Sequence, residues 1–105
     1  MISAKLLTRN GTLCGFDISG HSGSAARGSD IVCAAVSSAV YMAANTLTDV
    51  CWCSAAITED DGLLRFTVSR ADTQKAQEVL KGLQIHLQGL AHQYPTFIKI
   101  QLTEV

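Results

Sequence analysis

The side chains best suited to chemistry in this sequence are His21 and Cys33, which lie on either side of a loop of small residues. A thiol is a good nucleophile only as thiolate, and an ordinary thiol pKa of about 8.5 leaves a small fraction ionised at neutral pH. The positive end of a helix dipole and an imidazole that takes the proton both favour the thiolate. A cysteine at the start of a helix, with a histidine facing it, is therefore a minimal acyl-transfer site.

The segment between these two residues can bend and then start a helix. Gly20 precedes the histidine, and Gly28 ends a loop of six small or flexible residues: Ser22, Gly23, Ser24, Ala25, Ala26 and Arg27. Ser29 and Asp30 each carry a side-chain oxygen that can cap a first turn, which would place Cys33 in that turn. The free backbone N–H groups of such a turn could hold an oxyanion. We expect the loop to be mobile when empty and to close over a bound peptide.

A family signature covers the same residues. Gly20-His21, Gly28, the run Asp30-Ile31-Val32-Cys33-Ala34 and Ser37 resemble the signature of the ribosomal-processing cysteine protease Prp family, and chain length and element order fit as well. The resemblance implies a bacterial cytoplasmic cysteine endopeptidase that removes an N-terminal extension from a large-subunit ribosomal protein, after an apolar stretch that contains aromatic residues. It also implies a homodimer.

The resemblance assigns a role to each matching residue. It makes His21 the base and Cys33 the nucleophile, with Gly20, Gly28, Asp30 and Ser37 in support. Taken alone, Asp30 is more typical of a helix cap than of a third catalytic residue, and a carboxylate close to a thiol opposes thiolate formation. Ser37, one turn after Cys33, is explained equally well by packing and by a supporting hydrogen bond.

The loop departs from the family pattern. Many members have an aromatic and an acidic residue there, whereas this chain has Ser24, Ala26 and Arg27. The departure bears on how the loop contacts the substrate and leaves the assignment of His21 and Cys33 unchanged.

Two other functions use the same segment. In a non-catalytic module, the Gly20–Gly28 loop and the helix start would bind an anion or a ribosomal segment, and Cys33 would only be packed. A hydrolase of small thioesters or amides would use the same two side chains as a protease. Fast alkylation of Cys33 would distinguish an enzyme from the non-catalytic module. Incubation with candidate peptides would distinguish a protease from the hydrolase of small thioesters or amides.

Other motifs are weaker. Cys51-Trp52-Cys53 lacks the spacing and the second ligand pair of a zinc or redox site, so we expect core packing for Cys51 and Cys53, as for Cys14. The run from Gly23 to Ser29 resembles a phosphate loop but lacks its lysine, and Asp30 adds a negative charge. We expect no metal and no cofactor.

Composition limits the class of protein. The chain has 105 residues, of which 48% are hydrophobic and 16% charged, which suits one domain (residues 1–105) with a substantial core. A net charge of −1 with scattered cations argues against a nucleic-acid partner. We expect no apolar run near the roughly 20 residues of a membrane span and no signal-peptide layout, and hence a cytoplasmic protein with reduced thiols.

The hydrophobic pattern predicts an α+β domain in the order β-β-α-β-β-α-β, with two helices packed on an antiparallel or mixed sheet. Alternating runs predict strands at 2–9 and 12–19, joined by an Asn10-Gly11 turn, and at 50–58 and 63–69, joined by a turn over 59–62. A small-residue face predicts a helix over 30–48, and a clear apolar stripe predicts a second over 72–93, capped by Asp72 or Thr73 and ended by Pro95. A strand over 97–103 closes the chain.

The alternation also assigns faces. It places Cys51, Cys53 and Ile57 on one apolar face, and it places Ile98, Ile100 and Leu102 on one side of the last strand. It leaves Trp52 outward, and we expect Trp52 to form a homodimer surface with Leu7, Leu13 and Leu63. His86 and His92 should be exposed.

Overall fold

A computed structural model describes residues 1–21, 23 and 30–105 of the chain. Its elements follow the predicted order of an α+β domain: β1 (Ile2–Arg9), β2 (Thr12–Ser19), α1 (Ile31–Asn45), β3 (Ala55–Asp60), β4 (Leu63–Val68), α2 (Thr73–Gln93) and β5 (Ile98–Glu104). A π-helical turn, Thr46–Val50, extends α1, and a short 3₁₀ turn, Arg70–Asp72, precedes α2.

The strands form one mixed sheet in the order β3-β4-β2-β1-β5. Strands β1 and β5 are parallel, and the other neighbouring pairs are antiparallel. Because β5 enters the sheet from the same end as β1, the chain must run back along the sheet between β4 and β5. Helix α2 supplies this return.

Both hairpins have the predicted tight turns. Asn10 and Gly11 have φ values of 55° and 79°, as a two-residue turn of this kind requires. In the second hairpin β3 continues to Asp60, so the turn is shorter than predicted and contains Asp61 and Gly62. Pairing of β2 with β4 then joins the two hairpins into one surface.

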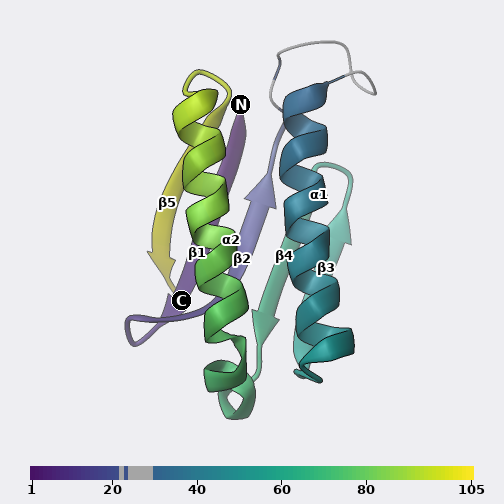
Figure 1. The fold of residues 1–105 in the computed structure, drawn as a ribbon, viewed down its shortest axis with the longest axis vertical. Helices are drawn as coiled ribbons and strands as arrows, with labels where there is room; N and C mark the ends of the chain where they lie inside the picture. The colour runs from purple at the N-terminus through teal and green to yellow at the C-terminus, as the bar shows by residue number, and fades with distance from the viewer. Residues whose placement is uncertain (22, 24–29) are drawn as a thin grey trace.

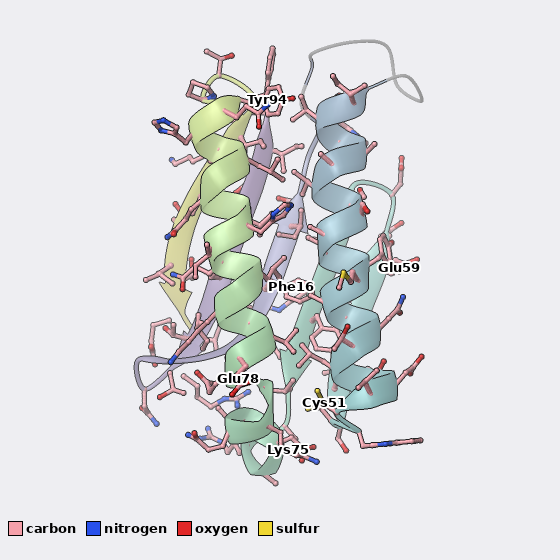
Figure 2. The ribbon with its side chains drawn as sticks, viewed as in Figure 1. Phe16, Cys51, Glu59, Lys75, Glu78 and Tyr94 are labelled. Atoms are coloured by element: carbon pink, nitrogen blue, oxygen red, sulfur yellow. The ribbon has the colours of Figure 1, made fainter. Side chains whose placement is uncertain are left out.

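Helices α1 and α2 run antiparallel to each other on one face of the sheet (Figure 1). Between this layer and the sheet lies the core, whose largest fully buried side chains include Phe16, Phe66, Leu6, Leu80 and Leu87. Phe16 and Phe66 are cross-strand partners with stacked rings whose centroids are 5.1 Å apart. Figure 2 shows Phe16 between the sheet and the helices.

The predicted strand over 50–58 is wrong in its first half. Residues up to Val50 continue the helix as a π turn, and β3 begins only at Ala55. Thr46 and Thr48 donate side-chain hydrogen bonds to the carbonyls of Met42 and Ala44, contacts that compete with regular helical bonding. Cys53 is nevertheless buried as predicted, and Cys51 is half-buried.

Two apolar residues lie on the predicted face of their strands without being buried. Ile57 pairs with the buried Phe66, and Leu102 pairs with the buried Leu6, so each shares the face of its partner. Ile57 is nevertheless 54% exposed and Leu102 is 61% exposed. Both lie on strands at the edges of the sheet, β3 and β5. An edge strand has a neighbour on one side only, so strand alternation alone does not bury its apolar residues.

The expected surface around Trp52 does not form as predicted. Trp52 is 79% exposed, in the left-handed region with φ 59°, but Leu7 and Leu13 are buried and Leu63 is half-buried. A register shift between Leu7 and Thr8 breaks the simple alternation of β1. His86 and His92 are exposed, as predicted.

Helix α2 ends at Gln93, two residues before Pro95, as predicted. The Asp72 side chain does not cap its start. That carboxylate instead accepts hydrogen bonds from the backbone N–H of Ser54 and the hydroxyl of Ser69, and pairs with Lys75. Asp72 therefore ties the chain before β3 to the start of α2.

Within residues 1–21, 23 and 30–105, one helical segment, Ile31–Val50, is apolar and long enough to cross a membrane, with a mean hydropathy of 1.5. This corrects the expectation that no apolar run approaches that length. The core helix of a soluble protein can pass the same test, and here Val32, Val36, Val40 and Leu47 are buried. These side chains pack one face of the segment against the core.

Candidate active site

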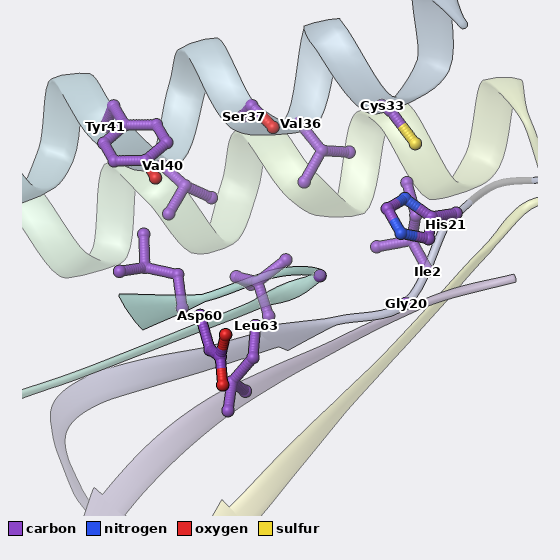
Figure 3. A pocket seen from close by; sticks show the side chains of 13 residues that line it. Ile2, Gly20, His21, Cys33, Val36, Ser37, Val40, Tyr41, Asp60 and Leu63 are labelled. Carbon is purple, nitrogen blue, oxygen red and sulfur yellow. The ribbon is translucent and has the colours of Figure 1, made fainter. Parts of the chain in front are cut away.

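His21 and Cys33 line the same hollow, at the end of the molecule where α1 begins. The cavity has a volume of about 170 Å³ and is lined by both apolar and polar residues. Figure 3 shows the Cys33 sulfur and the His21 ring pointing toward one another. The other lining residues come from β1, β2 and the residue after it, α1, the end of β3, β4, and the turn between β3 and β4: Ile2, Ile18, Gly20, Val36, Ser37, Val40, Tyr41, Asp60, Gly62, Leu63 and Leu64.

His21 follows directly after β2, and the backbone of Gly20 fixes where it leaves the sheet. Gly20 has φ +86°, and a Cβ at this position would lie 2.4 Å from the Met1 carbonyl oxygen. Its N–H donates a 2.9 Å hydrogen bond to the carbonyl of Gly62. Only glycine satisfies both the conformation and the space, which explains the glycine before the histidine.

Cys33 is half-buried in the first turn of α1, as predicted. Asp30 is the N-cap and is only 8% exposed. Its Oδ1 accepts the backbone N–H of Val32 at 3.0 Å and of Cys33 at 3.1 Å. The prediction of Asp30 as a cap is therefore confirmed, and the cap determines the direction in which the helix presents the thiol.

The same hydrogen bonds change the expected oxyanion site. Asp30 engages the N–H groups of Val32 and Cys33 through its side chain, and its carbonyl accepts the N–H of Ala34 at 3.1 Å. In this conformation these three N–H groups therefore do not donate to an oxyanion. The expectation that the first turn of the helix supplies the oxyanion donors is not met for these residues.

Further along α1, Ser37 and Tyr41 contribute to the wall of the hollow. Partial desolvation of the phenol is the largest cause that raises the pKa of Tyr41, and the nearby Glu59 carboxylate of β3 adds to the rise.

Most of the predicted substrate loop, Ser22, Ser24, Ala25, Ala26, Arg27 and Gly28, lies outside the described residues. Gly23 is exposed and has φ +75°. The predicted residues that the structure does bring together in the hollow are Gly20, His21, Cys33 and Ser37, and Asp30 caps the helix that carries the last two.

The second hairpin is the part of the site that sequence reasoning missed. Asp60, Gly62 and Leu63 line the hollow although they lie far from His21 in the sequence. The Asp-Gly pair was a clear turn signal. Its position beside His21, however, follows from the pairing of β2 with β4, which a single sequence does not give.

No grouping of three or more His, Cys, Asp or Glu side chains suited to a metal occurs in residues 1–21, 23 and 30–105. Cys14 and Cys53 are buried, and burial is the largest cause that raises the pKa of each thiol. All four cysteines are free thiols. In the Cys51-Trp52-Cys53 run, Cys53 is buried and Cys51 is half-buried against the core.

Comparison with known proteins gives one family. The family model described as cysteine protease Prp matches residues 1–99. No curated protein matches the chain.

Solved structures match the whole fold. An S. aureus structure, of an essential ribosomal processing protease Prp with a covalently linked product peptide, superposes with a TM-score of 0.88 at 23% identity, covering 98% of this chain and 100% of that one. The same S. aureus protease with a substrate peptide gives 0.83 at 22% identity and the same coverage. SMU.848 from Streptococcus mutans gives 0.82 at 28% identity, covering 100% of this chain and 96% of that one.

Proposed function

This chain belongs to the cysteine protease Prp family, and we propose that His21 and Cys33 are its catalytic dyad. Their shared place in one hollow, with sulfur and ring pointing toward one another, carries the proposal (Figure 3). We further propose that the substrate is the N-terminal extension of a bacterial large-subunit ribosomal protein. The ribosomal processing activity named for the S. aureus relatives of the same fold supports this choice.

In the proposed mechanism His21 takes the thiol proton from Cys33 as the sulfur attacks a peptide carbonyl carbon. The tetrahedral intermediate collapses to a thioester when the C–N bond breaks, and the imidazolium returns the proton to the leaving amine. His21 then removes a proton from water, which attacks the thioester. The second product leaves as the carboxylic acid, and the proton returns to the sulfur.

Asp30 limits how the oxyanion is stabilised. Since its oxygens already accept the N–H groups of Val32, Cys33 and Ala34, the oxyanion needs another donor or a shift of the cap when substrate binds. Asp30 therefore acts in this proposal by fixing the orientation of the thiol. Ser37 supports the wall of the hollow one turn further along.

The hollow suits an apolar substrate side chain. Its lining includes the apolar side chains of Ile2, Val36, Val40 and Leu63, together with the acidic Asp60. An extended peptide could place one apolar side chain in this space while its backbone lies beside Cys33. This agrees with a cleavage site that follows an apolar stretch.

The family assignment favours an enzyme over a non-catalytic binding module. We propose that the enzyme acts in the cytoplasm, since its four cysteines are free thiols. We also propose a homodimer, supported by the exposed apolar side chains of Met42, Val50 and Trp52. Sedimentation as an 11.2 kDa species at micromolar concentration would contradict the dimer.

The decisive experiment incubates the protein with a ribosomal-protein precursor that carries its N-terminal extension. Cleavage should occur with the natural sequence and disappear in Cys33→Ser and His21→Ala, both of which should retain the circular dichroism spectrum of the parent. A small thioester substrate in a parallel assay tests the alternative hydrolase. Turnover of the thioester without cleavage of any precursor peptide would overturn the protease proposal.

A further inference from the structure

We propose that Gly62, in the turn between β3 and β4, is a positioning residue for the His21 imidazole. The inference rests on the proposed role of His21 as base. It assigns a function to the second hairpin, which lies outside the signature segment. The observation that carries it is the contact between the ring and the turn.

The imidazole presents its Nε2 edge to Gly62. A Cβ built on Gly62 would lie 3.2 Å from His21 Nε2, and 3.8 and 3.9 Å from its Cε1 and Cδ2 atoms. A methyl group at 3.2 Å from a ring nitrogen is closer than ordinary van der Waals contact. A side chain at position 62 would therefore displace the ring by roughly a few tenths of an ångström, which is the amount by which this distance is shorter than a van der Waals contact.

The backbone of the turn has less freedom to yield than the ring. The carbonyl of Gly62 accepts the N–H of Gly20, and β4 is paired with β2 from Leu63 onward. His21, in contrast, is exposed and follows the end of its strand. The strain of an added side chain should therefore fall on the imidazole.

The position of the turn makes the contact specific to the site. The hydrogen bond from Gly20 N–H to Gly62 C=O joins the turn to the residue directly before His21. Asp60 and Gly62 line the same hollow as Cys33. The absence of a side chain at Gly62 thus sets how closely the His21 ring can approach the turn.

Gly11 provides a matched control. It occupies the corresponding turn of the first hairpin with φ +79°, close to the +72° of Gly62, but a Cβ there would meet nothing within 4 Å. Alanine at either position bears the same left-handed backbone cost, of about 1 kcal/mol. Only Gly62→Ala would also push the imidazole.

The experiment measures kcat and KM for precursor cleavage in Gly62→Ala and Gly11→Ala, with His21→Ala alongside. A ring displaced by a fraction of an ångström should lower kcat by about tenfold or more relative to Gly11→Ala, with KM little changed. The ¹⁵N shifts of the His21 ring should move in Gly62→Ala and stay unchanged in Gly11→Ala. Gly62→Asn and Gly11→Asn form a second pair, because asparagine tolerates positive φ better than alanine.

Each result of this experiment supports or overturns the positioning role of Gly62. Equal kcat in the Gly62 and Gly11 variants, with His21→Ala inactive, overturns the positioning role and leaves the dyad intact. Unfolding of both Gly62 variants while both Gly11 variants fold would also overturn it, since Gly62 would then be needed for the fold alone. Full activity of His21→Ala overturns the dyad, and this proposal with it.

Discussion

The Oδ1 atom of Asp30 accepts the backbone N–H of Cys33 at 3.1 Å, so a buried carboxylate holds the residue that carries the thiol. The same oxygen accepts the N–H of Val32. A secure cap stabilises the first turn of the helix and fixes the orientation of the residue that carries the thiol. Asp30 therefore contributes both stability and geometry to the site.

Replacing Asp30 separates these two effects. Asp30→Ala removes the cap and should lower the free energy of unfolding by about 1 kcal/mol, with kcat falling as the first turn frays. Asp30→Asn keeps an oxygen acceptor without the charge and should retain most of the stability. Urea unfolding and precursor cleavage measure the two quantities. Equal stability of Asp30→Ala and the parent would show that the cap contributes little.

The four thiols should react at different rates. Burial raises the pKa of Cys14 and Cys53, so at neutral pH less of each is thiolate, and both are also sterically protected. Cys33 is half-buried at the edge of a hollow and should be alkylated by iodoacetamide much faster than Cys14 or Cys53. Mass spectrometry of time points at pH 7.5 identifies the order. Similar slow rates at all four positions would contradict a reactive Cys33.

Much of this fold follows from local sequence signals. Both hairpins were expected from Asn10-Gly11 and Asp61-Gly62, because few residues other than glycine and asparagine adopt positive φ readily. The stripe of α2 and the cap at Asp30 were equally local. The cysteine and histidine were identified because the signature segment holds both within one short stretch.

Of the missed features, two depend on strand pairing and one lies within a single helix. Trp52 follows a π turn that prolongs α1, where Thr46 and Thr48 bond to carbonyls one turn earlier. Ile57 alternates as an inward residue but lies on the edge strand β3, where no further strand covers it. Gly62 joins the site only because β4 pairs with β2, and strand order is not encoded in any single segment.

Acid should weaken the contact between the C-terminal strand and the first hairpin. Glu104 accepts hydrogen bonds from the Thr8 hydroxyl and from the N–H groups of Gly11 and Asn10, which hold the pKa of its carboxyl below the usual 4.5. The folded state thus binds the proton less tightly than the unfolded state. The stabilisation is present above pH 4.5 and is lost as the pH falls through the lower pKa of the folded state.

The variant Glu104→Gln tests this sign. Its free energy of unfolding should be lower than that of the parent at pH 7, and the difference should shrink as the pH falls below 4.5. Urea titrations at several pH values between 3 and 7, at about 0.1 M salt, supply the comparison. A difference that is constant across this range would show that the charge of Glu104 contributes nothing to stability.

The stacked pair of Phe16 and Phe66 should matter for stability far more than for chemistry. Both side chains are fully buried, face each other across β2 and β4, and have rings 8° from parallel. Phe66→Ala removes this stack and leaves a cavity beneath α1 and α2, which should lower the free energy of unfolding by about 3–5 kcal/mol. Phe66→Leu keeps most of the volume and should cost about 1.5 kcal/mol or less.

The pair β2–β4 also joins His21 to the Gly62 turn, so any loss of kcat in the folded fraction of Phe66→Leu should be small compared with that in Gly62→Ala. Urea unfolding gives the first comparison and cleavage at saturating substrate the second. A loss of kcat in Phe66→Leu as large as that in Gly62→Ala would show that general loosening of the sheet, rather than contact with the ring, controls the imidazole.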